Sequence, residues 1–143
     1  MLKRFALVLL VLPLTSGCAV NRATATVTPG ADPGTARNFF VVQNREDTRG
    51  VGKLVADNLV KRGFTATAGA EVPRPPKVDA VVTYVSRWMW DITMYMVELT
   101  VTIRNPESSF PIASGNSYHT SLSRKSPDEM VDEVLTNIFN AKK

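Results

Sequence analysis

Two residue types from which many protein sites are built are nearly absent from this sequence. Its 143 residues include one cysteine, Cys18, and one histidine, His119. A single cysteine excludes an intramolecular disulfide, and these two residues leave only scattered carboxylates as further metal ligands, without the clustered spacing of zinc sites. We therefore expect no disulfide, no metal and no cofactor.

An excess of charge of one sign is also lacking. The chain has 17 basic and 13 acidic residues, and loss of Lys3 and Arg4 with the amino-terminal segment described below leaves 15 against 13, a balance of +2. Proteins that bind nucleic acid usually display a concentrated basic stripe, whereas the basic residues here are scattered among acidic ones. We expect no nucleic-acid partner.

The amino terminus carries an apolar run that is too short to span a bilayer. The run occupies residues 5–14 and follows Lys3 and Arg4, whereas a membrane-spanning helix needs about 20 apolar residues. A basic start followed by a short apolar stretch is the layout of a secretory signal. We predict that residues 1–17 are a signal peptide that is cleaved off.

The residues around the predicted cleavage point, Leu14-Thr15-Ser16-Gly17-Cys18, resemble the lipobox read by the bacterial lipoprotein peptidase. The resemblance implies that Cys18 receives a diacylglycerol thioether and becomes the acylated amino terminus. Buried acyl chains contribute about 0.8 kcal/mol per CH₂, so a multiply acylated cysteine holds a small domain on a membrane without a transmembrane helix. The alternative is an ordinary secretory signal whose cysteine is incidental.

The residue after the cysteine bears on location. In lipoproteins of bacteria with two membranes, an aspartate at this position commonly signals retention in the inner membrane, and here the residue is Ala19. The same resemblance therefore implies an outer-membrane protein that is lipid-anchored and faces the periplasm.

Composition divides the rest of the chain in two. Residues 18–36 are predicted to be the lipidated cysteine and a flexible tether, because residues 21–36 are rich in Thr, Ala, Pro and Gly and have no apolar period. Residues 37–143 have the length of one small domain with one core.

Periodicity predicts seven elements within residues 37–143. Strands are expected over 38–43 and 64–67, on either side of a helix near 49–62 that ends at Gly63. Residues 78–103 are expected to form a long hairpin with its turn near 91–93. A strand over about 112–122 precedes a last helix, where Ser126, Pro127 and Glu129 form a capping box. We predict one α+β domain, a mainly antiparallel sheet with two helices, in the order β-α-β-β-β-β-α.

Several short motifs of this layout resemble a family of small bacterial envelope lipoproteins. The motifs are Lys61-Arg62-Gly63-Phe64, Asp79-Ala80-Val81-Val82, Trp88-Met89-Trp90-Asp91 and Ser114-Gly115. With the lipobox, they are similar in arrangement to YajG and to the N-terminal domain of TolB. The resemblance implies a fold and a compartment. Because such proteins mostly have no assigned chemistry, it implies no catalytic residue.

Catalytic candidates are weak. His119 lies among serines in a segment where chance supplies such neighbours, so we expect a surface or edge histidine rather than a catalytic base. The acidic cluster of the last helix lies in its first turns, where acids suit the helix dipole and are solvated; it consists of Asp128, Glu129, Asp132 and Glu133. Gly50-Val51-Gly52 lacks the third glycine of a phosphate-binding loop. We predict that the protein is not an enzyme.

The candidate binding surface is the end of the predicted hairpin. Trp88 and Trp90 point the same way on one strand, while Met94 and Met96 share a face beyond the turn, where residues 94–103 are expected to alternate strictly between two faces. Tryptophan and methionine are enriched at protein interfaces. We predict that these four residues bind a partner. The alternative is that a helix covers them as ordinary core.

Together these features predict a membrane-anchored periplasmic lipoprotein that acts as a non-catalytic binding or assembly module for an envelope protein complex. The expected partners are the membrane, through the lipid on Cys18, and an envelope protein. The alternative is a binder of peptidoglycan or of a small envelope ligand through an aromatic surface. The oligomeric state is left open.

Overall fold

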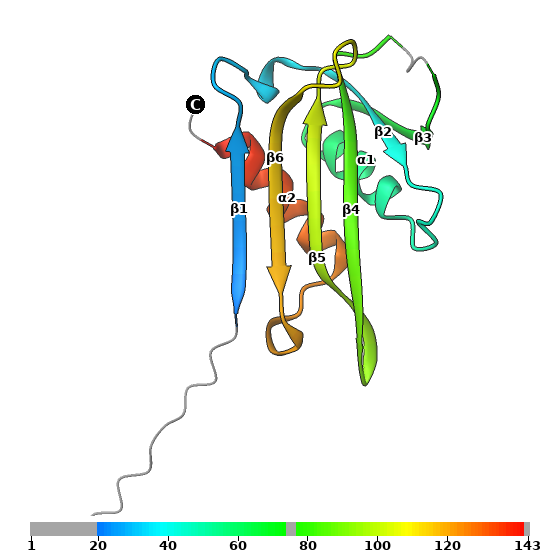
Figure 1. Ribbon diagram of the computed structural model, residues 1–143, viewed down its shortest axis with the longest axis vertical. Helices are drawn as coiled ribbons and strands as arrows, with labels where there is room; N and C mark the ends of the chain where they lie inside the picture. Colours follow the sequence, from blue (N-terminus) through cyan, green and yellow to red (C-terminus); the bar gives the residue numbers. More distant parts are fainter. Residues whose placement is uncertain (1–19, 74–76, 142–143) are drawn as a thin grey trace, which may run out of the picture.

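The computed structural model describes residues 20–73 and 77–141, which form one six-stranded sheet and two helices (Figure 1). Cys18 and the predicted signal peptide lie outside these residues. The strands are β1 (Asn21–Val27), β2 (Asn38–Gln43), β3 (Thr65–Ala70), β4 (Ala80–Asp91), β5 (Thr93–Arg104) and β6 (Pro111–His119), in the order β1-β6-β5-β4-β2-β3. The helices are α1 (Val51–Lys61) and α2 (Pro127–Asn140). The predicted single α+β domain and its element order from residue 38 onward are confirmed.

The prediction of a flexible tether over residues 21–36 is wrong. Residues 21–27 are strand β1, which pairs antiparallel with β6 from Asn21 opposite His119 to Val27 opposite Ala113. Further on, Pro33 and Ala36 are buried. The apolar residues of β1 are Ala23, Ala25 and Val27, which alternate with threonines, but two of the three are alanines, so the strand period is weak in the sequence. The folded domain therefore begins near residue 21 instead of 37.

The sheet is mixed. Strands β4, β5, β6 and β1 are successively antiparallel, whereas β2 pairs in parallel with both β3 and β4. Parallel neighbours need a crossover connection, and α1 supplies it between β2 and β3. The predicted antiparallel character therefore holds for the four strands at one side of the sheet only.

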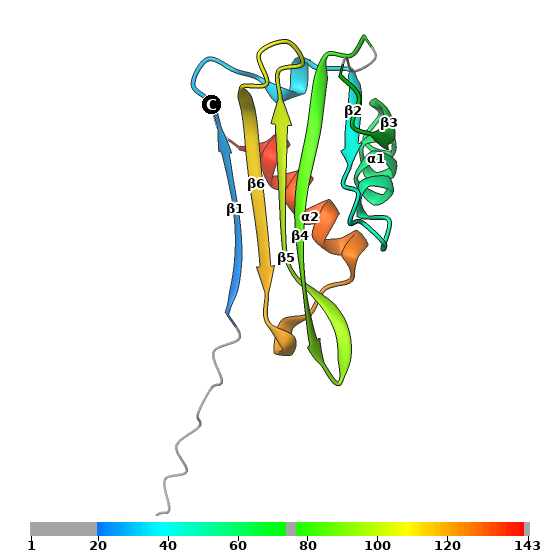
Figure 2. The ribbon, with the colours of Figure 1, turned by 45° about the vertical axis from the view of Figure 1, so that its right-hand side comes forward.

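Both helices cover the same face of the sheet, and no helix of the described residues covers the opposite face (Figures 1 and 2). The buried cluster lies between the helices and the sheet and includes Leu59 of α1, Leu135 and Ile138 of α2, and Leu99 of β5. At Gly115 of β6 the strand and α2 approach closely, since a Cβ there would lie 2.9 Å from Ile138 Cγ1.

The helix starts are set by short polar side chains. In α2, Glu129 N donates to Ser126 Oγ at 3.2 Å and Ser126 N donates to Glu129 Oε2 at 2.7 Å, so the predicted capping box is present. At α1, Asp47 Oδ2 accepts from Gly52 N at 2.9 Å and from the Tyr84 hydroxyl at 2.6 Å. Burial and the bond to Asp47 raise the pKa of Tyr84 to about 12, which keeps this hydroxyl a donor.

Candidate functional site

The hairpin of β4 and β5 brings the four predicted binding residues together. Its register places Trp88 opposite Met96 and Trp90 opposite Met94. Glu98 lies opposite Arg87, however, so Val97 has no directly opposite residue and forms a β-bulge. A bulge reverses the face on which later residues fall, and the predicted strict alternation over 94–103 is therefore wrong at this point.

Burial divides these four residues into two pairs. Met96 is 1% exposed and belongs to the core cluster, and Trp88 is half-buried and packs against that cluster. Trp90 is 71% exposed, and Met94 is also exposed. Two further apolar residues near the turn, Met89 and Ile92, are exposed as well. We call the four exposed residues Met89, Trp90, Ile92 and Met94 the hairpin tip.

Ile92 occupies the apex of the turn in a conformation that does not suit its side chain. Its φ is +61°, in the left-handed region. This region costs an L-residue roughly 1–2 kcal/mol, and a β-branched residue there is an outlier. Asparagine or glycine would relieve the backbone, yet the apex carries an aliphatic side chain that is 88% exposed.

Arg124 fastens the hairpin tip to the segment that follows β6. Its Nη2 donates to the carbonyl oxygen of Asp91 at 2.7 Å, and its Nη1 donates to Thr93 Oγ1 at 2.7 Å. The guanidinium carbon also lies 4.3 Å from the ring centroid of Tyr95. Just before Arg124 comes a 3-10 turn, η2 (Ser121–Ser123), whose Leu122 is exposed. The tip is therefore held on both sides of its apex.

Trp88 is occupied by contacts within the domain. Its Nε1 donates to Ser86 Oγ at 3.2 Å, and the guanidinium carbon of Arg49 lies 4.4 Å from its ring centroid. A shallow depression beside it is lined by Arg49, Arg124 and Lys125. The cationic groups of Arg49, Arg124 and Lys125 therefore lie next to the hairpin tip.

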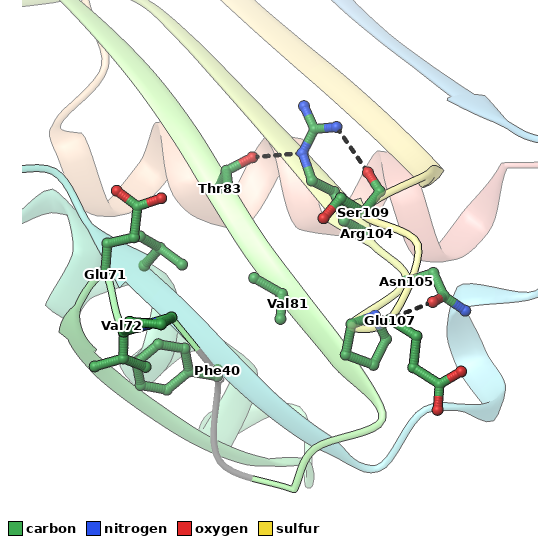
Figure 3. Close-up of a pocket in the computed structure, with 12 residues that line it drawn as sticks. Phe40, Glu71, Val72, Val81, Thr83, Arg104, Asn105, Glu107 and Ser109 are labelled. Atoms are coloured by element: carbon green, nitrogen blue, oxygen red, sulfur yellow. Dashed lines mark hydrogen bonds between the residues drawn. The ribbon is translucent and has the colours of Figure 1, made fainter.

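A pocket of about 600 Å³ lies on the helix-free face of the sheet (Figure 3). Phe40 and Val81 form part of its floor, and Val72 and Glu107 come from loops at its rim. Arg104 lies among them, where its Nε donates to Thr83 Oγ1 at 3.1 Å. Sequence reasoning missed this pocket because it joins segments that are far apart along the chain.

His119 is buried, and the expectation of a surface or edge histidine is wrong. Its Nε2 lies 2.7 Å from Glu133 Oε2, which also accepts from Ser117 Oγ at 2.5 Å, while Lys125 Nζ donates to Glu133 Oε1 at 2.7 Å. Glu133 is thus no solvated acid, although Asp128 and Glu129 are exposed as predicted. The Ser117 hydroxyl donates to the carboxylate and not to the imidazole.

Burial acts to raise the pKa of Glu133, but the hydrogen bonds from Lys125, Ser117 and His119 outweigh it and lower this pKa to about 2. The carboxylate is therefore charged at neutral pH and holds β6, α2 and the loop between them together. This geometry explains the cluster as a structural one.

The described residues, 20–73 and 77–141, contain no group of three or more His, Cys, Asp or Glu side chains that could hold a metal ion. None of their helices is long and apolar enough to cross a membrane.

Known proteins are similar to this chain in structure but not detectably in sequence. No protein-family model and no curated protein matches it. A PelC dodecamer from Paraburkholderia phytofirmans matches with a TM-score of 0.60 at 12% identity, over 86% of this chain and 100% of that chain. A PDZ domain protein from Parabacteroides distasonis matches with a TM-score of 0.51 at 11% identity, over 87% of this chain and 38% of that chain.

A minor lipoprotein from Acinetobacter baumannii is also among the similar structures. Its TM-score is 0.38 at 12% identity, over 72% of this chain and 90% of that chain. At these identities the first two likenesses show a shared fold, and the third is too low to carry an argument. The resemblance to YajG and to the N-terminal domain of TolB stays a prediction.

Proposed function

We propose that this chain is a lipid-anchored, non-catalytic assembly module of the bacterial envelope, held on the outer membrane through Cys18 and acting through protein contacts. The observation that carries the proposal is the presence of two open sheet edges. Within the described residues, β1 pairs only with β6, and β3 pairs only with β2. Unpaired edge strands are templates for pairing with another chain.

The edge at β3 lacks two of the usual protections against such pairing. Its six residues, Thr65–Ala70, include no charge and no proline, and these are the devices by which edges are commonly blocked. The edge at β1 carries one charged side chain, Arg22. Both edges therefore suit regular backbone pairing.

A second copy of this chain is the first candidate partner. The pairing directions make β1 and β3 antiparallel to each other, so β3 of one copy and β1 of the next would form an antiparallel pair. Such a head-to-tail contact closes into a ring when the rotation between copies allows it. All amino termini of this ring would lie on one side, as anchoring in one membrane requires. The dodecameric state of PelC, which shares the fold, supports this candidate.

Cysteine pairs test the assembly directly. In a Cys18→Ala background, we expect Thr24→Cys in β1 combined with Thr67→Cys in β3, or the same pair shifted by one residue, to give a ladder of disulfide-linked oligomers on a non-reducing gel. Paired strands bring Cα atoms within disulfide range. Each single variant is the matched control and forms no ladder. A monomer by light scattering with no ladder in any register would contradict assembly through the edges.

The anchor has its own test. Cys18→Ala should abolish incorporation of labelled fatty acid and leave the precursor uncleaved by the lipoprotein peptidase. Detergent partitioning measures the outcome. Normal processing and continued membrane association of the variant would overturn the lipoprotein proposal.

The pocket on the helix-free face favours a second candidate function, the binding of peptidoglycan or of a small envelope ligand. Phe110, next to the pocket residue Ser109, is exposed, and aromatic rings suit stacking on sugars. Sedimentation with purified peptidoglycan would favour this function, and Phe110→Ser should then weaken it. Recovery of an envelope protein after crosslinking, without such sedimentation, would favour the assembly module.

A further inference from the structure

We propose that the hairpin tip inserts into the surface of the same bilayer that holds the lipid anchor, so that the domain stands on the membrane at two points. This inference rests on the proposed lipidation of Cys18. It assigns a bilayer, and not a protein, as the occupant of the surface that the sequence analysis predicted for a partner.

The first step is the position of the anchor. β1 begins at Asn21, three residues after Cys18, and three extended residues span at most about 10 Å. Because residues 21–36 belong to the fold, no long tether lifts the domain away from the lipid. The start of β1 must therefore lie close to the membrane.

The second step is that the tip lies at this same end of the molecule (Figure 1). Asn21 is paired with His119, the last residue of β6, and its side chain is hydrogen-bonded to Ser123. The next residue, Arg124, binds Asp91 and Thr93 on either side of the apex. A short series of contacts thus links the anchor end of β1 to the tip.

The third step is the chemistry of the surface. The four tip residues are exposed, and Leu122 of η2 adds a fifth large apolar side chain at this end. A tryptophan with aliphatic neighbours is typical of side chains that enter the boundary between headgroups and acyl chains. Insertion into a bilayer would bury the aliphatic side chain of Ile92, and this favourable burial would offset the backbone strain at the apex.

The charges near the tip suit a membrane surface. Asp91 is paired with Arg124, whose Nη2 lies 3.2 Å from its Oδ2. Behind the tip, Arg49 and Arg124 stack on the rings of Trp88 and Tyr95. Inserted apolar residues backed by cations match the acyl chains and the anionic headgroups of a lipid surface.

The experiment uses the two tryptophans and the single cysteine of the chain. Chain 18–143 is coupled through Cys18 to a maleimide phospholipid in vesicles of phosphatidylethanolamine and phosphatidylglycerol, some of the lipids being brominated in their acyl chains. Trp88→Phe leaves Trp90 as the reporter, and Trp90→Phe is the matched control that leaves Trp88. We expect the emission of Trp90 to shift to shorter wavelength and to be quenched at least twofold by the brominated lipids, with much weaker quenching of Trp88.

Unshifted and unquenched emission from Trp90 in vesicle-bound chain would overturn the inference. Chemical coupling makes this result independent of acylation in the cell, so failure of the lipoprotein proposal is measured separately by fatty-acid labelling. A second measurement uses Ile92→Asn, which relieves the backbone at the apex. This variant should fold at least as stably and reduce binding of uncoupled Cys18→Ser chain to vesicles at least threefold. Efficient crosslinking of a photoreactive residue at position 90 to a protein instead of to lipid would also overturn the inference.

Discussion

At the scale of single residues, Glu133 shows how context changes the role of a side chain. In the sequence it is one of four acids at the start of a helix, a pattern typical of solvated residues. In the structure three donors from two segments converge on its carboxylate, Ser117 and His119 from β6 and Lys125 from the loop before α2. The position of those donors depends on how β6 meets α2, which no local pattern encodes.

The lowered pKa of Glu133 predicts a dependence of stability on pH. Its pKa is about 2 in the folded protein against an ordinary value of 4.5, so the unfolded chain takes up a proton first as the pH falls. The stability that this carboxylate contributes is therefore complete above about pH 5 and is lost between there and about pH 2. Thermal melts across this range should show a steeper fall for the native protein than for Glu133→Gln.

The exposed carboxylate Asp57, which is paired with Lys53 on the surface of α1, supplies the control. Because exposed pairs contribute little, Asp57→Asn should keep the steep pH dependence of the native protein. Equal pH dependence in the native protein and in Glu133→Gln would show that the buried cluster does not stabilise the fold.

Ser126 supports the start of α2 through the capping box, and its replacement gives a second test at this scale. Ser126→Ala removes the oxygen that accepts from Glu129 N, and such a loss typically costs about 1 kcal/mol. Chemical denaturation should show this decrease in the free energy of unfolding. The conservative Ser126→Asp should retain most of the stability, and equal losses in both variants would contradict a capping role.

At the scale of elements, α2 is the helix that the sequence predicts most completely. Its apolar stripe and its cap were both recognised in the sequence, and Met130, Val131, Val134, Leu135 and Ile138 are all buried. The sequence predicts this helix because capping and the helical period are properties of residues that are close together along the chain.

Truncation of this stripe should strongly destabilise the domain. Leu135 is fully buried, and Leu135→Ala should lower the free energy of unfolding by about 2–5 kcal/mol, as large-to-small changes in cores do. Val60 of α1 is 52% exposed and gives the matched control, since Val60→Ala removes much less buried surface than Leu135→Ala. A melting temperature unchanged by Leu135→Ala would show that α2 does not pack on the core.

The β4–β5 hairpin was predicted as an element, but the division of its surface was not. The bulge at Val97 moves Met96 into the core, and Trp88 lies under Arg49. A bulge depends on how two paired strands pack against the helices that cover them. The alternating pattern of residues 94–103 gives no indication of the bulge at Val97.

Serine replacements separate the two tryptophans. Trp88→Ser removes a ring packed against the core cluster and should lower the melting temperature by several degrees. Trp90 is exposed, so Trp90→Ser should change the free energy of unfolding by less than about 0.5 kcal/mol. Thermal unfolding by circular dichroism compares them. A large loss in Trp90→Ser would place that ring in the core and remove it from the tip.

At the scale of the whole molecule, the main change is where the folded domain starts. The stretch taken for a tether contains β1, and this brings the predicted lipid within three residues of the sheet. Under the proposed lipidation of Cys18, the end of the sheet that carries the hairpin tip is the end nearest the membrane. A composition rich in Thr and Ala did not reveal this, because an edge strand is defined by backbone bonds to a distant partner, here His119 opposite Asn21, 98 residues further along the chain.

The sequence by itself determined the features that depend on neighbouring residues. These are the capped amphipathic helix α2, the hairpin, and the α+β class with its element order from residue 38. The tertiary structure alone decided the features that depend on distant pairing: the edge strand β1, the bulge at Val97, the buried Ser117–Glu133–His119 cluster, and the placing of both helices on one face. Short-range periodicity and capping act within a few residues, whereas register and burial are set by contacts between segments that only folding brings together.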